Sequence, residues 1–222
     1  AVNLHHGAEQ LDAHLPAGVH RSVETPDALG TAGALGALRP WIEGRDVVVA
    51  NADAWLDPSL DLGGFVAGWD RERTRLLCVT DPDRGDFGDL RYCGVALIPA
   101  AVAASFAPVP SGLYEVSWRG EELAGRLDLV PVDVAFIDCG TPGDYLAANL
   151  AATGGASVVP DDVVVPADAH LERVVLWPGA EVGAGEVLVD AIRTPSVTVL
   201  VRGAAGQAPR SGVATSRTVD PA

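Results

Sequence analysis

The sequence predicts an α/β layer fold, with a mostly parallel central sheet flanked by helices and a short β-coil at the C-terminal end. Two apolar runs, 46–50 and 132–137, have the composition of strands that are buried on both faces. Each run is followed by an aspartate and then by a segment with a helical pattern, and this alternation is typical of parallel sheets covered by helices. From Gly154 onward, valine and leucine recur at short intervals between proline, glycine and aspartate, which predicts turns of a hexapeptide β-helix.

Apolar spacing and helix-ending residues predict the elements in chain order. A helix over 5–15 is indicated by apolar residues at helical spacing, and Pro16 and Gly18 end it. A later helix begins at Pro142, whose fixed backbone angle suits a first helical turn, and extends over 142–152. The other strands are predicted at 1–4, 19–24, 75–80 and 92–98, and the other helices at 31–41, 60–70 and 99–106.

These elements divide the chain into three parts. Residues 1–153 form the α/β domain, and residues 154–202 form a left-handed β-helix-like region. Only about two coils fit there, fewer than the three that such a stack needs alone, so the region must pack against the α/β domain. Residues 203–222 are small, polar and without pattern, which predicts a disordered tail.

Composition excludes several classes of function. The chain of 222 residues carries 30 acidic and 15 basic side chains, a net charge of −15, and all the basic ones are arginine. This balance argues against a nucleic acid partner, which requires a basic surface. No apolar stretch reaches the roughly 18 residues of a membrane span. The three cysteines lack metal or disulfide spacing, so we expect free thiols in a reducing, cytoplasmic setting.

A glycine-containing segment, Leu29-Gly30-Thr31-Ala32-Gly33, joins a loop to a helix. Glycines there let a ligand approach main-chain N–H groups, and the N-terminus of a helix favours negative charge. Such glycines are more often simple turns. From this segment alone, both interpretations stay open.

Two aspartates follow apolar runs. Asp53 comes shortly after the run 46–50, and Asp138 follows the run 132–137 and precedes a glycine turn. Ligands of open α/β sheets bind beyond the carboxyl ends of the strands. Two carboxylates there can share one Mg²⁺ and position a phosphoryl group. Asp53 could instead only cap the next turn.

The chain resembles the sugar-phosphate nucleotidyltransferases, a family with a GT-A-like, Rossmann-like fold that includes mannose-1-phosphate guanylyltransferases. The resemblance covers roughly residues 2–193, and 137–146 is its most specific segment. It implies an enzyme that forms an NDP-sugar and pyrophosphate from an NTP and a sugar 1-phosphate, with Mg²⁺ as cofactor. The implied residues are Asp53 and Asp138 for catalysis and metal binding, Leu29, Gly30, Thr31 and Gly33 for the nucleotide, and Gly94 and Glu115 for the sugar. The resemblance also implies homo-oligomers assembled through the β-helical tail.

The sequence differs from the family in the segment that binds the triphosphate. The family opens with a glycine-rich loop that carries arginine and lysine, and these 222 residues contain no such loop. Because phosphoryl transfer requires the neutralisation of charge, we expect a missing upstream portion and impaired activity of this chain alone. The nearby Arg21, Arg39 and Arg45 lie outside the motifs. The alternative is a non-catalytic relative that binds a nucleotide or a sugar and regulates a partner.

Overall fold

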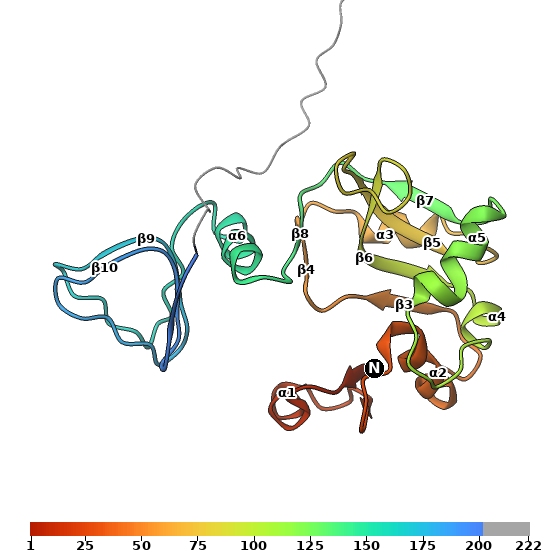
Figure 1. Ribbon diagram of the computed structural model, residues 1–222, viewed down its shortest axis with the longest axis horizontal. Helices are drawn as coiled ribbons and strands as arrows, with labels where there is room; N and C mark the ends of the chain where they lie inside the picture. The colour runs from red at the N-terminus through yellow and green to blue at the C-terminus, as the bar shows by residue number, and fades with distance from the viewer. Residues whose placement is uncertain (202–222) are drawn as a thin grey trace, which may run out of the picture. The chain divides into compact units, whose positions relative to one another are not determined.

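The computed structural model describes residues 1–201 and has a mixed α/β architecture (Figure 1). Two compact units divide the chain, one made of residues 1–50 and 61–131, the other of residues 51–60 and the chain from 132 onward. This division differs from the expected boundary at residue 153, and the predicted tail at 203–222 lies outside the described residues. Within residues 1–201, no helix has the length and apolar character needed to cross a membrane.

The first unit holds most of the helices and one larger sheet. Its strands are β1 (Val2–Leu4), β2 (Arg21–Val23), β3 (Val47–Ala50), β5 (Arg75–Thr80), β6 (Leu90–Ile98) and β7 (Asp128–Pro131). Its helices are α1 (Ala8–His14), α2 (Gly30–Ile42), α3 (Leu62–Ala67), α4 (Ala100–Ala103), a π-helix (Tyr114–Trp118) and α5 (Arg119–Leu123).

The main sheet is mixed, not mostly parallel. Its strand order is β3-β6-β5-β7; β6 is antiparallel to both neighbours, and only β5 and β7 are parallel. The expectation of a parallel sheet is therefore wrong for this sheet. The run at 46–50 was also expected to be buried on both faces, yet β3 lies at an edge and its residues alternate in burial, with Val48 60% exposed.

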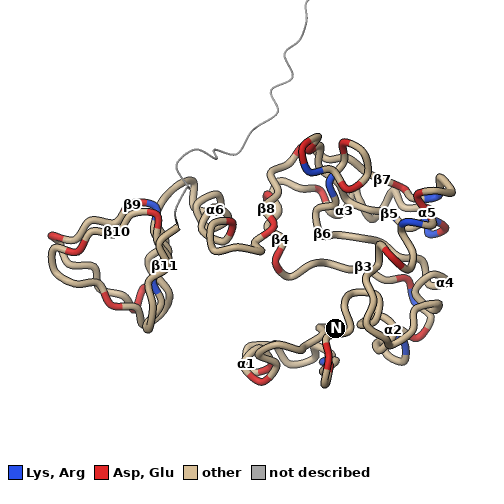
Figure 2. The backbone as a smooth tube through the Cα atoms, in the orientation of Figure 1, with Lys and Arg blue, Asp and Glu red and all other residues tan. Residues whose placement is uncertain are grey.

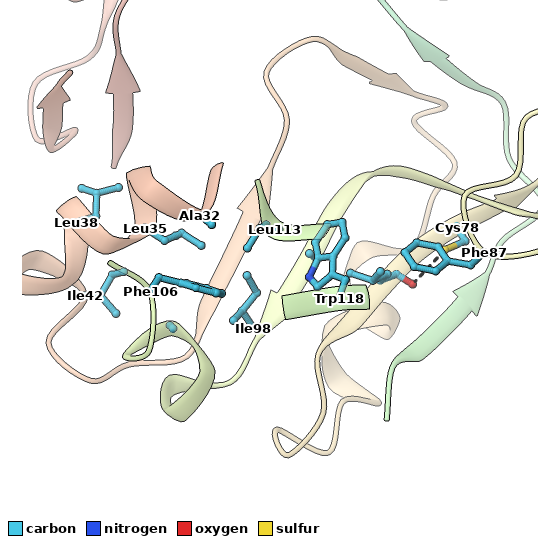
Figure 3. Close-up of a cluster of buried hydrophobic side chains, with 13 residues drawn as sticks. Ala32, Leu35, Leu38, Ile42, Cys78, Phe87, Ile98, Phe106, Leu113 and Trp118 are labelled. Carbon is cyan, nitrogen blue, oxygen red and sulfur yellow. Dashed lines mark hydrogen bonds between the residues drawn. The ribbon is translucent and has the colours of Figure 1, made fainter. Parts of the chain in front are cut away.

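The hydrophobic core of this unit lies between α2 and the sheet. Leu76 and Cys78 of β5, and Ala96 and Ile98 of β6, point to the same face, because alternate residues of a strand do so. Figure 3 shows side chains of α2 lying beside Phe106 and Ile98. The members contributed by α2 are Ala32, Leu35, Leu38 and Ile42.

The N-terminal segment forms a small layer of its own. Strands β1 and β2 pair in parallel, with Leu4 opposite Val23 and fully buried. Helix α1 connects them and buries none of its residues, and its Leu11 is 51% exposed. The elements are as predicted, but α1 contributes little to the core.

The second unit contains β4 (Ala54–Leu56), β8 (Phe136–Asp138), α6 (Pro142–Ala152), β9 (His170–Leu176), β10 (Val187–Arg193) and β11 (Thr198–Leu200). The predicted helix over 142–152 is confirmed in full. The predicted strand over 132–137 is shorter and ends at Asp138, because only 136–138 pair with a partner, β4.

Beyond α6 the chain winds into stacked coils with a repeat of 17 residues. His170 pairs with Val187 in parallel, and Val158, Val175 and Ile192 pair in succession at the same spacing. The Asp162 carboxylate likewise accepts a hydrogen bond from the Gly179 N–H at 2.7 Å. Apolar side chains fill the coils: Val163, Val174, Leu176, Ala180, Leu188 and Ala191.

Helix α6 packs on these coils. Leu146 is fully buried against Val175 and Ile192, which belong to two successive turns of the stack. This contact explains why α6 belongs to the second unit, although the sequence placed it in the α/β domain.

Candidate functional site

Pairing of β4 with β8 brings Asp53 and Asp138 to neighbouring positions. Ala54 lies opposite Asp138 in this antiparallel ladder, and the Cys139 N–H donates to the Asp53 carbonyl oxygen at 2.8 Å. Both aspartates are exposed to solvent. Figure 2 shows acidic residues where β4 and β8 run together. The ladder is antiparallel, so the two aspartates lie at one end of a two-stranded ribbon and not, as expected, at the carboxyl ends of parallel strands.

A third carboxylate, Asp144, follows Asp138 by six positions. Its position is fixed at the start of α6, where the Thr141 Oγ1 accepts from the Asp144 N–H at 3.2 Å and donates to Asp144 Oδ2 at 2.6 Å. The pKa of the Cys139 thiol is raised by burial and then by the charges of Asp138, Asp144 and Asp53. The charges of all three carboxylates thus act on Cys139.

This donor set suits a magnesium ion that is also held by substrate. Among residues 1–201, no group of three or more His, Cys, Asp or Glu side chains is placed to hold a metal ion by itself. Mg²⁺ in phosphoryl-transfer sites is typically bound by one or two carboxylates, and phosphate oxygens and water complete the shell. Exposed carboxylates at neighbouring backbone positions, Asp53 and Asp138, are of the type that such binding uses.

The segment Leu29–Thr31, predicted to bind the nucleotide, is the entry to α2 in the first unit. Gly30 has φ of 66°, a left-handed value that favours glycine. The Ser111 carbonyl accepts from the N–H groups of Ala32 and Gly33 at 3.1 and 3.4 Å, and the Ser111 N–H donates to the Leu29 carbonyl at 2.8 Å. Two of the N–H groups at the helix N-terminus are therefore already occupied.

Glycine serves packing at two further positions of α2. Gly33 is buried, and a Cβ there would lie 2.3 Å from the Val109 carbonyl oxygen. A Cβ at Gly36 would lie 2.3 Å from the carbonyl carbon of Ala107. Gly33 thus allows α2 to approach the segment 107–111, whereas Gly30 and Thr31 remain exposed. A role of Gly33 in holding the nucleotide stays a prediction, and such a role would be indirect.

The residues predicted to face the sugar, Gly94 and Glu115, lie on two elements that contact each other. Gly94 occupies an irregularity of β6, where the register with β5 shifts, and has φ of 88°. Bulges of this kind are frequent beside active sites. Glu115 is an exposed residue of the π-helix, whose Trp118 packs edge-on against Tyr92 of β6 at 4.9 Å between ring centroids. No described contact joins Gly94 to Glu115.

The arginines nearest these motifs are engaged within the chain. Arg21 donates to the Leu15 and Val19 carbonyls and pairs with Asp12. Arg39 donates to the Ala104 carbonyl at 3.0 Å, and Arg45 to the Ile42 carbonyl at 2.9 Å. Arg21 and Arg45 thus bind carbonyls close in sequence, and Arg39 joins the end of α2 to the end of α4. Two features of the site were missed by the sequence analysis: the backbone clamp of Ser111 and the buried Glu24 beside Leu29.

No protein-family model and no curated protein matches the chain. Solved structures do share its fold. The chain is similar to mannose-1-phosphate geranyltransferase from Thermus thermophilus, with a TM-score of 0.60 and 14% identity over 90% of this chain and 78% of that one. It is also similar to HddC from Yersinia pseudotuberculosis, with a TM-score of 0.50 and 20% identity over 66% of this chain and 75% of that one. The resemblance to sugar-phosphate nucleotidyltransferases is thus confirmed for the fold.

Proposed function

We propose that the chain is a sugar-1-phosphate nucleotidyltransferase, which forms an NDP-sugar and pyrophosphate from an NTP and a sugar 1-phosphate. The observation that carries the proposal is the pair Asp53 and Asp138, which the β4–β8 ladder holds at adjacent, exposed positions. The fold shared with mannose-1-phosphate geranyltransferase supports it.

The reaction needs positioning and charge neutralisation more than it needs a nucleophilic side chain. An oxygen of the sugar phosphate forms a bond to the α-phosphorus, and the bond from that phosphorus to the bridging oxygen breaks as pyrophosphate leaves. Asp53 and Asp138 would hold a Mg²⁺ ion, which when bound supplies positive charge to the phosphates. Leu29, Gly30 and Thr31 would hold the nucleotide.

The sugar is assigned to the bulge of β6 and to the π-helix. Gly94 is buried and a side chain at its φ of 88° would be strained, so it would serve the sugar site by shaping the bend of β6. Glu115, exposed on the π-helix, would accept hydrogen bonds from sugar hydroxyls.

Charge limits how well these 222 residues can act by themselves. Net charge is −15, and Arg21, Arg39 and Arg45 already donate to backbone carbonyls. We therefore expect slow turnover and a strong requirement for Mg²⁺, and faster turnover when a glycine-rich loop with arginine and lysine is joined upstream.

The test is pyrophosphate release from a panel of NTPs and sugar 1-phosphates, with and without Mg²⁺. Asp53→Asn and Asp138→Asn should each abolish the release that depends on Mg²⁺. Asp161→Asn is the matched control, since it makes the same charge change at an exposed position of the same unit. Mn²⁺ binding followed by electron paramagnetic resonance gives a second readout, which should weaken in the first two variants only. Equal Mn²⁺ binding in all of them would contradict the metal assignment.

The engaged arginines favour one alternative, a non-catalytic relative that binds nucleotide or sugar and regulates a partner. The two functions separate when the upstream loop is supplied. An enzyme then releases pyrophosphate, whereas a binding protein retains nucleotide affinity and releases none.

We further propose that the stacked coils form a left-handed β-helix through which the protein assembles into homo-oligomers. The 17-residue repeat is close to the roughly 18 residues of a β-helical turn with three sides of six residues, which supports the β-helix. Val164 and Val187 on the coils are 83% and 65% exposed, and such exposed apolar side chains support an interface. Light scattering coupled to gel filtration measures the assembly. Val164→Asp and Val187→Asp should each reduce the mass of the assembled particle, and a monomeric parent chain would refute the proposal.

A further inference from the structure

Glu24 is the one charged residue that is buried in the part of the chain from 1 to 201, with 3% of its surface exposed. It follows directly after β2 and lies five positions before Leu29. Burying a carboxylate costs several kcal/mol unless hydrogen bonds replace the lost water. What the carboxylate holds therefore indicates why it is there.

The two oxygens of the Glu24 carboxylate hold different elements. Oε2 accepts from the Leu29 N–H at 2.8 Å, and Oε1 accepts from Asn3 Nδ2 of β1 at 3.1 Å. The main chain of Glu24 is tied as well, because its N–H donates to the Leu4 carbonyl at 2.7 Å and its carbonyl accepts from His5 Nδ1 at 2.9 Å. Glu24 thus connects the end of β1 to the residue that precedes α2.

Leu29 is held from the opposite side by Ser111, whose N–H donates to the Leu29 carbonyl. The Leu29 N–H is thereby bound by the Glu24 side chain, and the Leu29 carbonyl is bound by the Ser111 backbone. The next two residues, Gly30 and Thr31, are exposed, and within residues 1–201 their N–H groups donate no hydrogen bond. The clamp on Leu29 thus sets the orientation of two exposed peptides with unused donors.

A simple helix cap does not account for this arrangement. In α2 it is the Ser111 carbonyl that accepts from Ala32 and Gly33, and Ala32 is one of the two N–H groups that a capping side chain normally binds. Glu24 instead binds the N–H of Leu29, the N-cap residue itself. Burial of the Glu24 carboxylate offsets much of the stability that its two hydrogen bonds contribute, so stability alone does not account for its place.

We propose that Glu24 is a positioning residue for nucleotide binding, and that it fixes the Leu29 peptide so that the N–H groups of Gly30 and Thr31 meet acceptor atoms of the nucleobase. This inference rests on the proposed function, because it assumes that the exposed loop binds a nucleotide. Glu24 touches no substrate itself and acts through Leu29.

The experiment compares Glu24→Ala, Glu24→Gln and a control, Leu97→Val, in the full 222-residue chain. Glutamine can replace glutamate: its oxygen accepts from Leu29, and its amide donates to Asn3 once the Asn3 amide is flipped. Leu97 is fully buried in β6 of the same unit, so Leu97→Val lowers stability without touching the loop. NTP affinity is measured by calorimetry at a temperature where all four proteins are folded.

We expect Glu24→Ala to raise the Kd for the preferred NTP about tenfold, equivalent to about 1.4 kcal/mol. Glu24→Gln and Leu97→Val should stay within about twofold of the parent, and the affinity for sugar 1-phosphate should be unchanged in all variants. An unchanged NTP Kd in Glu24→Ala overturns the proposal, and so does an equal loss in Glu24→Ala and Leu97→Val.

A second readout separates this proposal from the proposed function. If the parent chain binds no NTP, the proposed function fails, and hydrogen exchange at the Leu29 amide still tests the clamp without nucleotide. Exchange of this amide should speed up in Glu24→Ala and stay slow in Glu24→Gln and Leu97→Val. Unaltered protection in Glu24→Ala would show that Glu24 does not hold the loop.

Discussion

Replacing Gly36 by alanine should destabilise the protein, against the usual effect of this substitution in a helix. Gly36 lies inside α2, where alanine is normally favoured over glycine by about 1 kcal/mol. Here a Cβ would lie 2.3 Å from the Ala107 carbonyl carbon and 2.7 Å from Pro108 N. Both atoms belong to the backbone, so no side chain can swing away to make room.

The size of the effect follows from the overlap. Ordinary contacts of a Cβ begin at 3.4 Å, so α2 or the segment at 107 must move from 2.3 Å by about 1.1 Å. Overpacking of this kind costs about 1–3 kcal/mol, and because the obstacle is backbone we expect the upper part of that range. After subtraction of the gain in helix propensity, the net loss is about 2 kcal/mol. In a chain of this length that corresponds to a fall in Tm of about 4–8 °C.

Urea denaturation followed by tryptophan fluorescence measures the loss, since Trp118 is buried in the same core as α2. Gly120→Ala is the matched control, because nothing lies within 4 Å of a Cβ there. It should raise the free energy of unfolding by about 0.5–1 kcal/mol. A Gly36→Ala variant as stable as the parent would refute the close packing of α2 against the segment 107–111.

Two more predictions concern the second unit, and a third compares the cysteines of both units. Thr141→Ala removes the N-cap of α6 and should lower stability by about 1 kcal/mol, measured by thermal unfolding; Thr141→Ser should retain the cap, and an equal loss in both would contradict the role of the hydroxyl. The hydrogen bond from Arg173 lowers the pKa of Asp190 below that of the unfolded chain. The pair therefore contributes stability above about pH 4, and this stability is lost as the pH falls through the pKa of Asp190 in the folded protein. Asp190→Asn should remove this contribution to acid unfolding, as followed by circular dichroism. A thiol reagent should modify only Cys139 in the folded protein and all three cysteines in urea, as measured by mass spectrometry. Cys78 and Cys93 are fully buried, and burial raises the pKa of both thiols to about 12. Modification of either buried thiol at the rate of Cys139 would contradict the core described above.

Local signals predicted the elements well. The helix over 142–152 was predicted with its full bounds because Pro142 marks its first turn. Thr141 is the N-cap residue of this helix. The strand over 75–80 is likewise confirmed. Both elements are defined by residues within a few positions of their ends, where single-sequence patterns carry the most information.

Pairing between distant segments was predicted poorly. Strand β7 was missed, because its four residues form a strand only by pairing with β5, which lies more than 50 positions earlier. The apolar run of β3 does not specify its direction in the sheet, and an antiparallel edge position was taken for a parallel, buried one. A run of valines indicates a strand, whereas the neighbour of that strand depends on the whole fold.

The candidate site shows the same division between local and distant information. Asp53 and Asp138 were predicted to act together, and the structure makes them neighbours by a route that the sequence does not reveal, the short β4–β8 ribbon. Glu24 was missed because nothing in its local sequence distinguishes a buried glutamate from an exposed one. Its burial depends on Asn3 and Leu29, and only the folded chain brings them together.

The clamp on Leu29 also explains why the sequence does not reveal which base would be bound. The exposed donors at Gly30 and Thr31 are peptide N–H groups, which every non-proline residue possesses. Their direction depends on Glu24, on Ser111 and on the left-handed φ of Gly30, not on the side chains of the loop itself. A base read by such peptides would be selected through backbone geometry. Changes at the buried Glu24 should therefore alter nucleotide preference more than changes at the exposed Thr31 side chain.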